Sequence, residues 1–130
     1  MFSRLFKKKA KEILLIEDDE AVSSTVEIAL KAKNYGVLKT TQGHNGIQLA
    51  MRNIPALIIL DIRLPDMEGW QVISNLKSSE KTKNIPILIL SQLNQVGDIT
   101  TGFELGINGY VTKPLDLGKL YKKISEILGD

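Results

Sequence analysis

The stretch that decides the fold is "ILLIEDDE", residues 13–20, in which four aliphatic residues run directly into four acids. Aliphatic runs without alternating polar residues are typical of strands buried on both faces, as in a parallel sheet. Carboxylates crowded against the end of such a strand repel one another and lose hydration, so they need a compensating partner. The stretch therefore predicts a central strand that ends at a charged site.

Four further stretches indicate strands. "ALIIL" (56–60) and "ILIL" (87–90) resemble the first run, whereas "GVLKT" (36–40) and "GYV" (109–111) are weaker and more polar. We expect five strands, with the two weaker ones at the edges of the sheet.

Helical patterns of apolar residues alternate with these strands. The last pattern is the clearest, because its apolar residues recur at i, i+3, i+4 and i+7 between a candidate N-cap, Asp116, and a glycine stop, Gly129. A strand–helix order repeated five times predicts an α/β domain with a doubly wound five-stranded parallel sheet. The predicted helices cover residues 20–33, 44–52, 69–77, 95–106 and 116–129.

Length and composition describe one ordinary domain. The chain has 130 residues, 43% of them hydrophobic, and it contains no cysteine, which excludes disulfides and cysteine metal sites. Its apolar runs fall far short of the roughly 20 residues of a membrane span, and no signal peptide is visible. We expect a cytoplasmic protein.

The net charge of +2 hides an asymmetry between the N-terminus and the rest of the chain. Residues 1–11 hold five of the 17 basic residues and no acid, which leaves 12 basic against 15 acidic side chains in residues 12–130. We therefore expect a basic tail over residues 1–11 and one mildly acidic domain over residues 12–130. The basic charge belongs to the tail and does not indicate direct nucleic acid binding by the domain.

The tail itself has two interpretations. Phe2, Leu5 and Phe6 have the spacing of a short basic amphipathic helix that could make weak contact with an anionic membrane. Eleven residues are few for stable lipid binding, so a solubilising terminus is the favoured alternative.

Polar residues follow four of the five predicted strands. In open α/β sheets, ligands bind beyond the carboxyl ends of the strands. Each polar residue alone would be an ordinary loop or cap residue, but the whole set converges on one edge of the sheet. The set comprises Glu17, Asp18, Asp61, Ser91 and Lys113.

These residue types together suit phosphoryl chemistry. Three clustered carboxylates need a counter-cation, and carboxylate oxygens suit Mg²⁺, which also takes phosphate oxygens. Lys113 offers a point charge for a phosphate, and Ser91 offers a hydrogen-bond donor. A carboxylate can itself accept a phosphoryl group as an aspartyl phosphate, a reaction that needs mainly positioning and charge neutralisation.

Four motifs occur together: "ILLIEDDE", "LIILDIRLPDMEGW", "IPILILS" and "GYVTKP". In this order and at this spacing, the sequence closely resembles the receiver domain of two-component response regulators over about residues 12–128. The resemblance implies a five-stranded parallel sheet of flavodoxin-like order 2-1-3-4-5 with five helices.

The resemblance also implies a metal site around a phosphorylated aspartate. Asp61 matches the phosphoacceptor. Asp18 matches the acid that binds Mg²⁺ directly, and Glu17 matches its partner, which acts through water. The backbone carbonyl of Arg63 matches the third protein oxygen on the metal.

The remaining matches concern phosphate pairing and switching. Lys113 matches the phosphate-pairing lysine, and its bond to Pro114 is expected to be cis. Ser91 matches the hydroxyl that moves to the phosphoryl group, and Tyr110 matches the aromatic residue that then turns inward. Gln92 departs from the pattern, because a small residue is usual after the switch hydroxyl.

The function implied is a signalling switch that a histidine kinase or phosphotransfer protein phosphorylates on Asp61. Such a domain assists its own phosphorylation and dephosphorylation but is not an enzyme acting on a separate substrate. Its output is expected through a downstream protein that contacts the face formed by the fourth helix, fifth strand and fifth helix.

Other interpretations stay open. The chain could be a stand-alone receiver, the N-terminal receiver of a longer transcriptional regulator, or a pseudo-receiver that serves as a fixed binding module. A phosphohydrolase of the haloacid dehalogenase type is disfavoured, because Arg63 occupies the position where that class needs a second acid.

Not every acid is assigned to the chemistry. Asp19 and Glu20 are expected to open the first helix, where acids favour the helix dipole. Asp66 and Glu68 are expected to be loop and helix-start acids.

Overall fold

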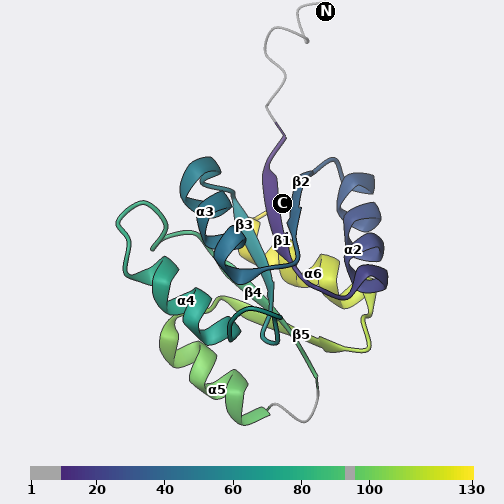
Figure 1. The fold of residues 1–130 in the computed structure, drawn as a ribbon. Coiled ribbons are helices and arrows are strands. Elements are labelled where there is room, and N and C mark those ends of the chain that lie inside the picture. The colour runs from purple at the N-terminus through teal and green to yellow at the C-terminus, as the bar shows by residue number, and fades with distance from the viewer. Residues whose placement is uncertain (1–9, 93–95) are drawn as a thin grey trace, which may run out of the picture.

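The computed structural model of the chain describes residues 10–92 and 96–130. In this described part, five strands alternate with five helices (Figure 1). The strands are β1 (Glu12–Ile16), β2 (Gly36–Thr40), β3 (Leu57–Asp61), β4 (Ile87–Gln92) and β5 (Gly109–Lys113). The helices are α2 (Glu20–Ala32), α3 (Gly43–Asn53), α4 (Gly69–Lys77), α5 (Val96–Leu105) and α6 (Leu117–Leu128).

The strands form one parallel sheet in the order β2-β1-β3-β4-β5. Helices cover both faces, with α3, α4 and α5 on one side and α2 and α6 on the other (Figure 1). The two weaker stretches, β2 and β5, form the edges of the sheet. The predicted fold class and strand order are confirmed.

Burial on both faces explains why the central strands read as unbroken aliphatic runs. In β1, Leu14 and Ile16 pack into the core that includes residues of α3 and α4. Ile13 and Leu15 point the other way, into the core that includes residues of α2 and α6. All four are fully buried, so truncating any one of them to alanine is expected to cost about 2–5 kcal/mol of stability.

The ends of three strands differ from expectation, since β4 also continues beyond its aliphatic run through Ser91 to Gln92. Asp61 and Lys113 are the last residues of β3 and β5, whereas the aliphatic runs placed them just after the strands. Sheet pairing continues through both, since Asp61 lies opposite Leu90 and Lys113 lies opposite Gln92. The backbone of these two site residues is therefore positioned by the sheet itself.

Capping residues begin and end α6 as predicted, and an acid opens α2 as predicted. Asp19 is the N-cap of α2, and its Oδ1 accepts hydrogen bonds from the N–H groups of Ala21 (2.9 Å) and Val22 (3.2 Å). Asp116 caps α6 in the same way, and Gly129 ends α6 with φ of 73°.

Residues 1–9, which make up most of the predicted basic tail and its membrane-contacting pattern, lie outside the described residues. Among the helices that the structure does describe, none is both long enough and apolar enough to cross a membrane.

Candidate functional site

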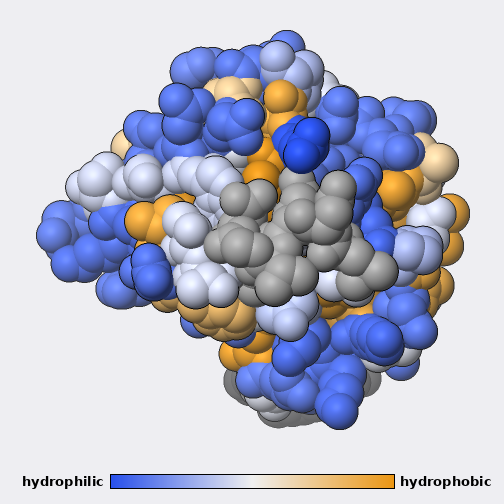
Figure 2. Space-filling model, turned by 90° about the horizontal axis from the view of Figure 1, so that it is seen from below, coloured by the Kyte–Doolittle hydropathy of each residue, from blue (hydrophilic) through white to orange (hydrophobic). Residues whose placement is uncertain are grey.

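The carboxyl ends of the central strands meet at one edge of the sheet. Ile16 of β1 pairs with Leu60 of β3, so the next residues, Glu17 and Asp61, lie side by side. Figure 2 views the molecule from this edge, and hydrophilic side chains predominate around the rim of the face. The sheet order thus brings together two acids that are far apart in the sequence.

A cluster of three carboxylates lies at this edge. One oxygen atom each from Glu17, Asp18 and Asp61 lies within 4.8 Å of the other two. Glu17 and Asp61 are buried, whereas Asp18 is exposed. Three acids this close need positive charge nearby to stay ionised together.

Lys113 supplies part of that charge. Its Nζ lies 2.8 Å from Oε1 of Glu17 and 3.2 Å from Oδ2 of Asp61. Because β4 separates β5 from β3, the side chain at position 113 must be long to reach the acids, and lysine has a flexible four-carbon stem. The Lys113–Pro114 peptide bond that follows is cis.

The protonation of these groups reflects burial and proximity. Burial, together with the neighbouring Asp61 carboxylate, raises the pKa of Glu17 to about 7, against the opposing effect of Lys113. Burial alone would lower the pKa of Lys113, but Glu17 and Asp61 raise it above the ordinary value. The site therefore holds a charged lysine between two acids of which one binds a proton readily.

One oxygen of Glu17 depends on Lys113 as its partner. The charged Lys113 Nζ, 2.8 Å from the buried Oε1, is the described partner of that atom. Buried polar atoms normally have such a partner, so the ion pair also fixes the position of the Glu17 carboxylate.

The loop after Asp61 is held close to the acids. The N–H of Arg63 donates a hydrogen bond to Oδ1 of Asp61 at 3.1 Å, and the N–H of Gly69 donates one to the carbonyl of Ile62 at 2.6 Å. A Cβ atom at position 69 would lie 2.7 Å from the Cα of Ile62, so this approach requires glycine.

Ser91 and Tyr110, the expected switch residues, lie on neighbouring strands. Ser91 is buried on β4, one residue beyond the Asp61–Leu90 pair, and its Oγ donates a hydrogen bond to the carbonyl of Gln92 at 3.2 Å. Tyr110 of β5 is 37% exposed, and its ring packs edge-on against Phe103 of α5 with 6.0 Å between the ring centroids.

The four consecutive acids divide into two pairs. Glu17 and Asp18 belong to the carboxylate cluster, whereas Asp19 caps α2 and Glu20 lies in the first turn of that helix. The expectation for Asp19 and Glu20 is confirmed.

Asp66 has a more specific place than the expected loop acid. Its carboxylate accepts hydrogen bonds from the N–H groups of Gly43 (2.8 Å) and His44 (3.0 Å) at the start of α3. No local sequence signal indicates this contact, because the partners lie more than twenty residues earlier in the chain.

Comparison with known proteins identifies the family. Residues 13–125 match the family model of the response regulator receiver domain, and the chain belongs to this family. The DNA-binding dual master transcriptional regulator RpaA of Synechocystis is 38% identical over 116 residues, which cover 89% of this chain and 48% of RpaA. The cell cycle response regulator CtrA of Brucella ovis is 39% identical over 116 residues, which cover 89% of this chain and 49% of CtrA. The chain spans about half the length of these curated relatives.

Solved structures agree with this placement. One is the crystal structure of the receiver domain of sensor histidine kinase PA1611 from Pseudomonas aeruginosa, with a magnesium ion coordinated in its active site cleft. The chain superposes on it with a TM-score of 0.85 at 26% sequence identity, covering 94% of this chain and all of that one.

The family defines the class of protein. The chain is a phosphorylation-dependent switch domain of two-component signal transduction, in a family of phosphoacceptor domains that are generally not classical enzymes. Receiver domains typically bind Mg²⁺ at an acidic pocket and interact with histidine kinases or phosphotransfer proteins, and the Glu17, Asp18 and Asp61 carboxylates form an acidic cluster here.

Proposed function

We propose that Asp61 accepts the phosphoryl group from a histidine kinase or phosphotransfer protein, and that the aspartyl phosphate changes the binding of a downstream protein. The observation that carries the proposal is the position of Lys113, whose Nζ contacts both Glu17 and Asp61. A lysine that a second acid holds beside the acceptor is placed to neutralise an incoming phosphoryl group.

Access and charge favour Asp61 over the other two acids as the acceptor. The side chain of Glu17 is completely buried, so a donor cannot reach it, whereas that of Asp61 is 11% exposed. Asp18 is exposed, but no ion pair joins it to a lysine within the described residues. Asp61 alone combines access with a lysine partner.

The transfer exchanges one bond for another. An Asp61 carboxylate oxygen bonds to phosphorus as the phosphorus–nitrogen bond of the donor's phosphohistidine breaks, and the released imidazole takes a proton from solvent. Throughout, Lys113 stays charged and the Arg63 N–H orients Oδ1 of Asp61. We propose that the same groups assist the later attack of water on the aspartyl phosphate.

The donor set fits Mg²⁺. The three carboxylates offer hard oxygen ligands within 4.8 Å of one another, and the exposed Asp18 leaves the cluster open to solvent. Asp18 and Asp61 would bind the ion directly, Glu17 through water, and Arg63 through its backbone carbonyl. When bound, the ion neutralises the phosphoryl oxygens.

The proposed output passes through Ser91 and Tyr110. Movement of Ser91 toward the phosphoryl group lets Tyr110 turn inward, which would break its edge-on contact with Phe103 of α5. Phe103 and Tyr110 are both partly exposed, so their rearrangement would alter the surface of α5, β5 and α6. Phosphorylation would thereby shift the population of a two-state surface that a partner protein reads.

The wider assignment follows the charge distribution and the family. We propose that residues 12–130 form the receiver domain in the cytoplasm and that residues 1–11 form a separate basic tail. Direct nucleic acid binding by residues 12–130 is not proposed, because acids outnumber basic residues there.

Intact mass spectrometry tests the proposal. Incubation with Mg²⁺ and acetyl phosphate is expected to add the mass of one phosphoryl group to the wild-type chain and to the Asp116→Asn control. No adduct is expected with Asp61→Asn, or with the wild type in EDTA. A wild type that takes no phosphoryl group and binds no Mg²⁺ would be a pseudo-receiver, contrary to the proposal.

A further inference from the structure

The loop between β3 and α4, residues 62–68, carries the Arg63 segment next to Asp61. Its first turn is tied to β3 through the hydrogen bond from the Arg63 N–H to Asp61. Its last residue is tied to α4 through a reciprocal capping pair between Glu68 and Gln71. Both attachments lie within the loop's own flanking elements, so neither anchors the loop to the rest of the domain.

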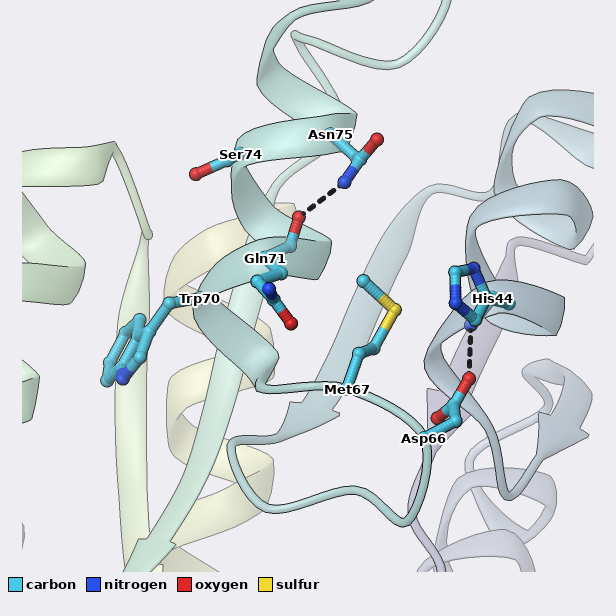
Figure 3. A pocket seen from close by; sticks show the side chains of 7 residues that line it. All are labelled: His44, Asp66, Met67, Trp70, Gln71, Ser74 and Asn75. Carbon is cyan, nitrogen blue, oxygen red and sulfur yellow. Dashed lines mark hydrogen bonds between the residues drawn. The ribbon is translucent and has the colours of Figure 1, made fainter.

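Asp66 anchors the middle of this loop to another helix. Its Oδ1 accepts the N–H of Gly43 at 2.8 Å, and its Oδ2 accepts the N–H of His44 at 3.0 Å. Figure 3 shows the Asp66 side chain directed at the start of α3. One carboxylate thereby satisfies two backbone donors of a helix that begins 23 residues earlier.

The start of α3 needs such a partner. The first N–H groups of a helix have no acceptors within the helix. Within the described structure, the N-cap residue Gln42 makes no side-chain capping bond, and the first turn of α3 holds no acid. The N–H groups of His44 and Gly43 lower the pKa of Asp66, so at neutral pH its charge faces the positive end of the helix dipole.

Close packing reinforces the hydrogen bonds. Met67, the next loop residue, lies between α3 and α4 in Figure 3. A Cβ atom at Gly43 would lie 2.5 Å from Cγ of Met67 and 2.9 Å from Cγ2 of Val72. Glycine therefore allows the first turn of α3 to pack directly against the loop. The contact between loop and helix is therefore both polar and tightly packed.

We propose that Asp66 is a positioning residue for the phosphorylation site: by capping α3 from outside, it holds the loop that carries Arg63 against Asp61. Among the described contacts, its two bonds are the only side-chain hydrogen bonds from this loop to an element other than β3 and α4. A loop released from α3 would shift the Arg63 N–H that orients Asp61. It would also shift the Arg63 carbonyl. The resulting loss of Mg²⁺ affinity rests on the proposed function, in which this carbonyl binds the ion.

The first measurement is backbone amide exchange in metal-free protein, followed by NMR. Asp66→Ala is expected to speed the exchange of the Arg63 and Gly69 amides by about tenfold relative to wild type. Asp66→Asn keeps one acceptor oxygen and should fall in between. The matched control is Asn53→Ala, which removes a side-chain hydrogen bond to Leu49 at the other end of α3 and should leave both amides unchanged.

The second measurement is the Mg²⁺ dissociation constant, by calorimetry on the same proteins. Asp66→Ala is expected to weaken Mg²⁺ binding by about tenfold, as loss of an outer partner of a metal ligand does. Asn53→Ala should bind like wild type, and Asp66→Asn should recover part of the affinity.

The outcomes separate this proposal from the proposed function. Amide exchange in Asp66→Ala that matches Asn53→Ala overturns the positioning role, whatever Mg²⁺ does. Should Asp66→Ala fail to fold, Asp66→Asn decides, and unchanged exchange in that variant overturns the role. A wild type that binds no Mg²⁺ contradicts the metal site of the proposed function, and the exchange comparison then decides the role of Asp66 by itself.

Discussion

The Nζ atom of Lys113 lies 2.8 Å from Oε1 of Glu17, and this ion pair joins the edge strand β5 to the end of the central strand β1. The side chain of Glu17 is completely buried, and it lies in one cluster with Asp18 and Asp61. Besides its place in the proposed metal site, Glu17 therefore holds the Lys113 side chain beside Asp61.

Removing the lysine should destabilise the metal-free protein in a pH-dependent way. Lys113→Met leaves two neighbouring carboxylates without their cation and should lower the free energy of unfolding at pH 8 by about 1–3 kcal/mol. The loss should be smaller at pH 6, where Glu17 binds a proton. Chemical denaturation at both pH values measures it. The control Lys123→Met removes only an exposed ion pair with Glu126 and should cost less than about 1 kcal/mol. Equal losses in the two variants would contradict the role given to Lys113.

The raised pKa of Glu17 predicts how stability depends on pH without metal. Because the folded-state pKa of about 7 exceeds the ordinary value of 4.5, the favourable contribution is complete below 4.5 and is lost as the pH rises through about 7. Glu17→Gln should flatten the decline between pH 5 and 8 in denaturation curves. Glu27→Gln should keep it, since Lys39 and Lys31 lower the pKa of Glu27 to about 2 and leave it ionised throughout. If the fall in stability between pH 5 and 8 persists in Glu17→Gln, a group other than Glu17 causes it.

The two halves of the acidic run should respond differently to Mg²⁺. Asp18→Ala is expected to abolish the rise in Tm that Mg²⁺ causes, because Asp18 would bind the ion directly. Asp19→Ala should keep that rise while losing about 1 kcal/mol of stability with the N-cap of α2. Thermal unfolding with Mg²⁺ and with EDTA measures both effects. If Asp19→Ala loses the Mg²⁺ response and Asp18→Ala keeps it, the division of residues 17–20 into two pairs is wrong.

One residue outside the site carries backbone strain. Ile54 follows α3 with φ of 44°, in the left-handed region that a β-branched side chain adopts at a cost. Ile54→Gly should raise the free energy of unfolding by up to about 1 kcal/mol, since glycine adopts this conformation freely and the side chain is 47% exposed. Ile54→Val keeps the β-branch and should bring no such gain. Chemical denaturation of both variants checks this, and a loss of stability in Ile54→Gly would show that packing of the side chain outweighs the strain.

Local patterns in the sequence account for most of the fold. The aliphatic runs revealed both faces of the buried sheet, because alternate residues of β1 enter opposite cores. The cap Asp116 and the helix-opening acid Asp19 were visible because each bonds to backbone within three residues of itself. The order of the strands, in contrast, came from the resemblance to receiver domains, since periodicity does not report which strands pair.

Long-range contacts could not be predicted from such patterns. The sequence suggested that Lys113 faces a phosphate, but not that it also pairs with Glu17 on the central strand. Asp66 read as an ordinary loop acid, because its partners at the start of α3 are distant in sequence and become neighbours only in the folded chain. Both contacts depend on how separate elements pack, which one local stretch does not encode.

The central claim is that Asp61, held beside Lys113, accepts the phosphoryl group. Borohydride reduces an aspartyl phosphate to homoserine, so treating the phosphorylated chain and sequencing its peptides by mass spectrometry locates the acceptor directly. Homoserine is expected at position 61 in the wild type and at no position in Asp61→Asn. Homoserine at position 18, or at any residue outside the acid cluster, would contradict the account.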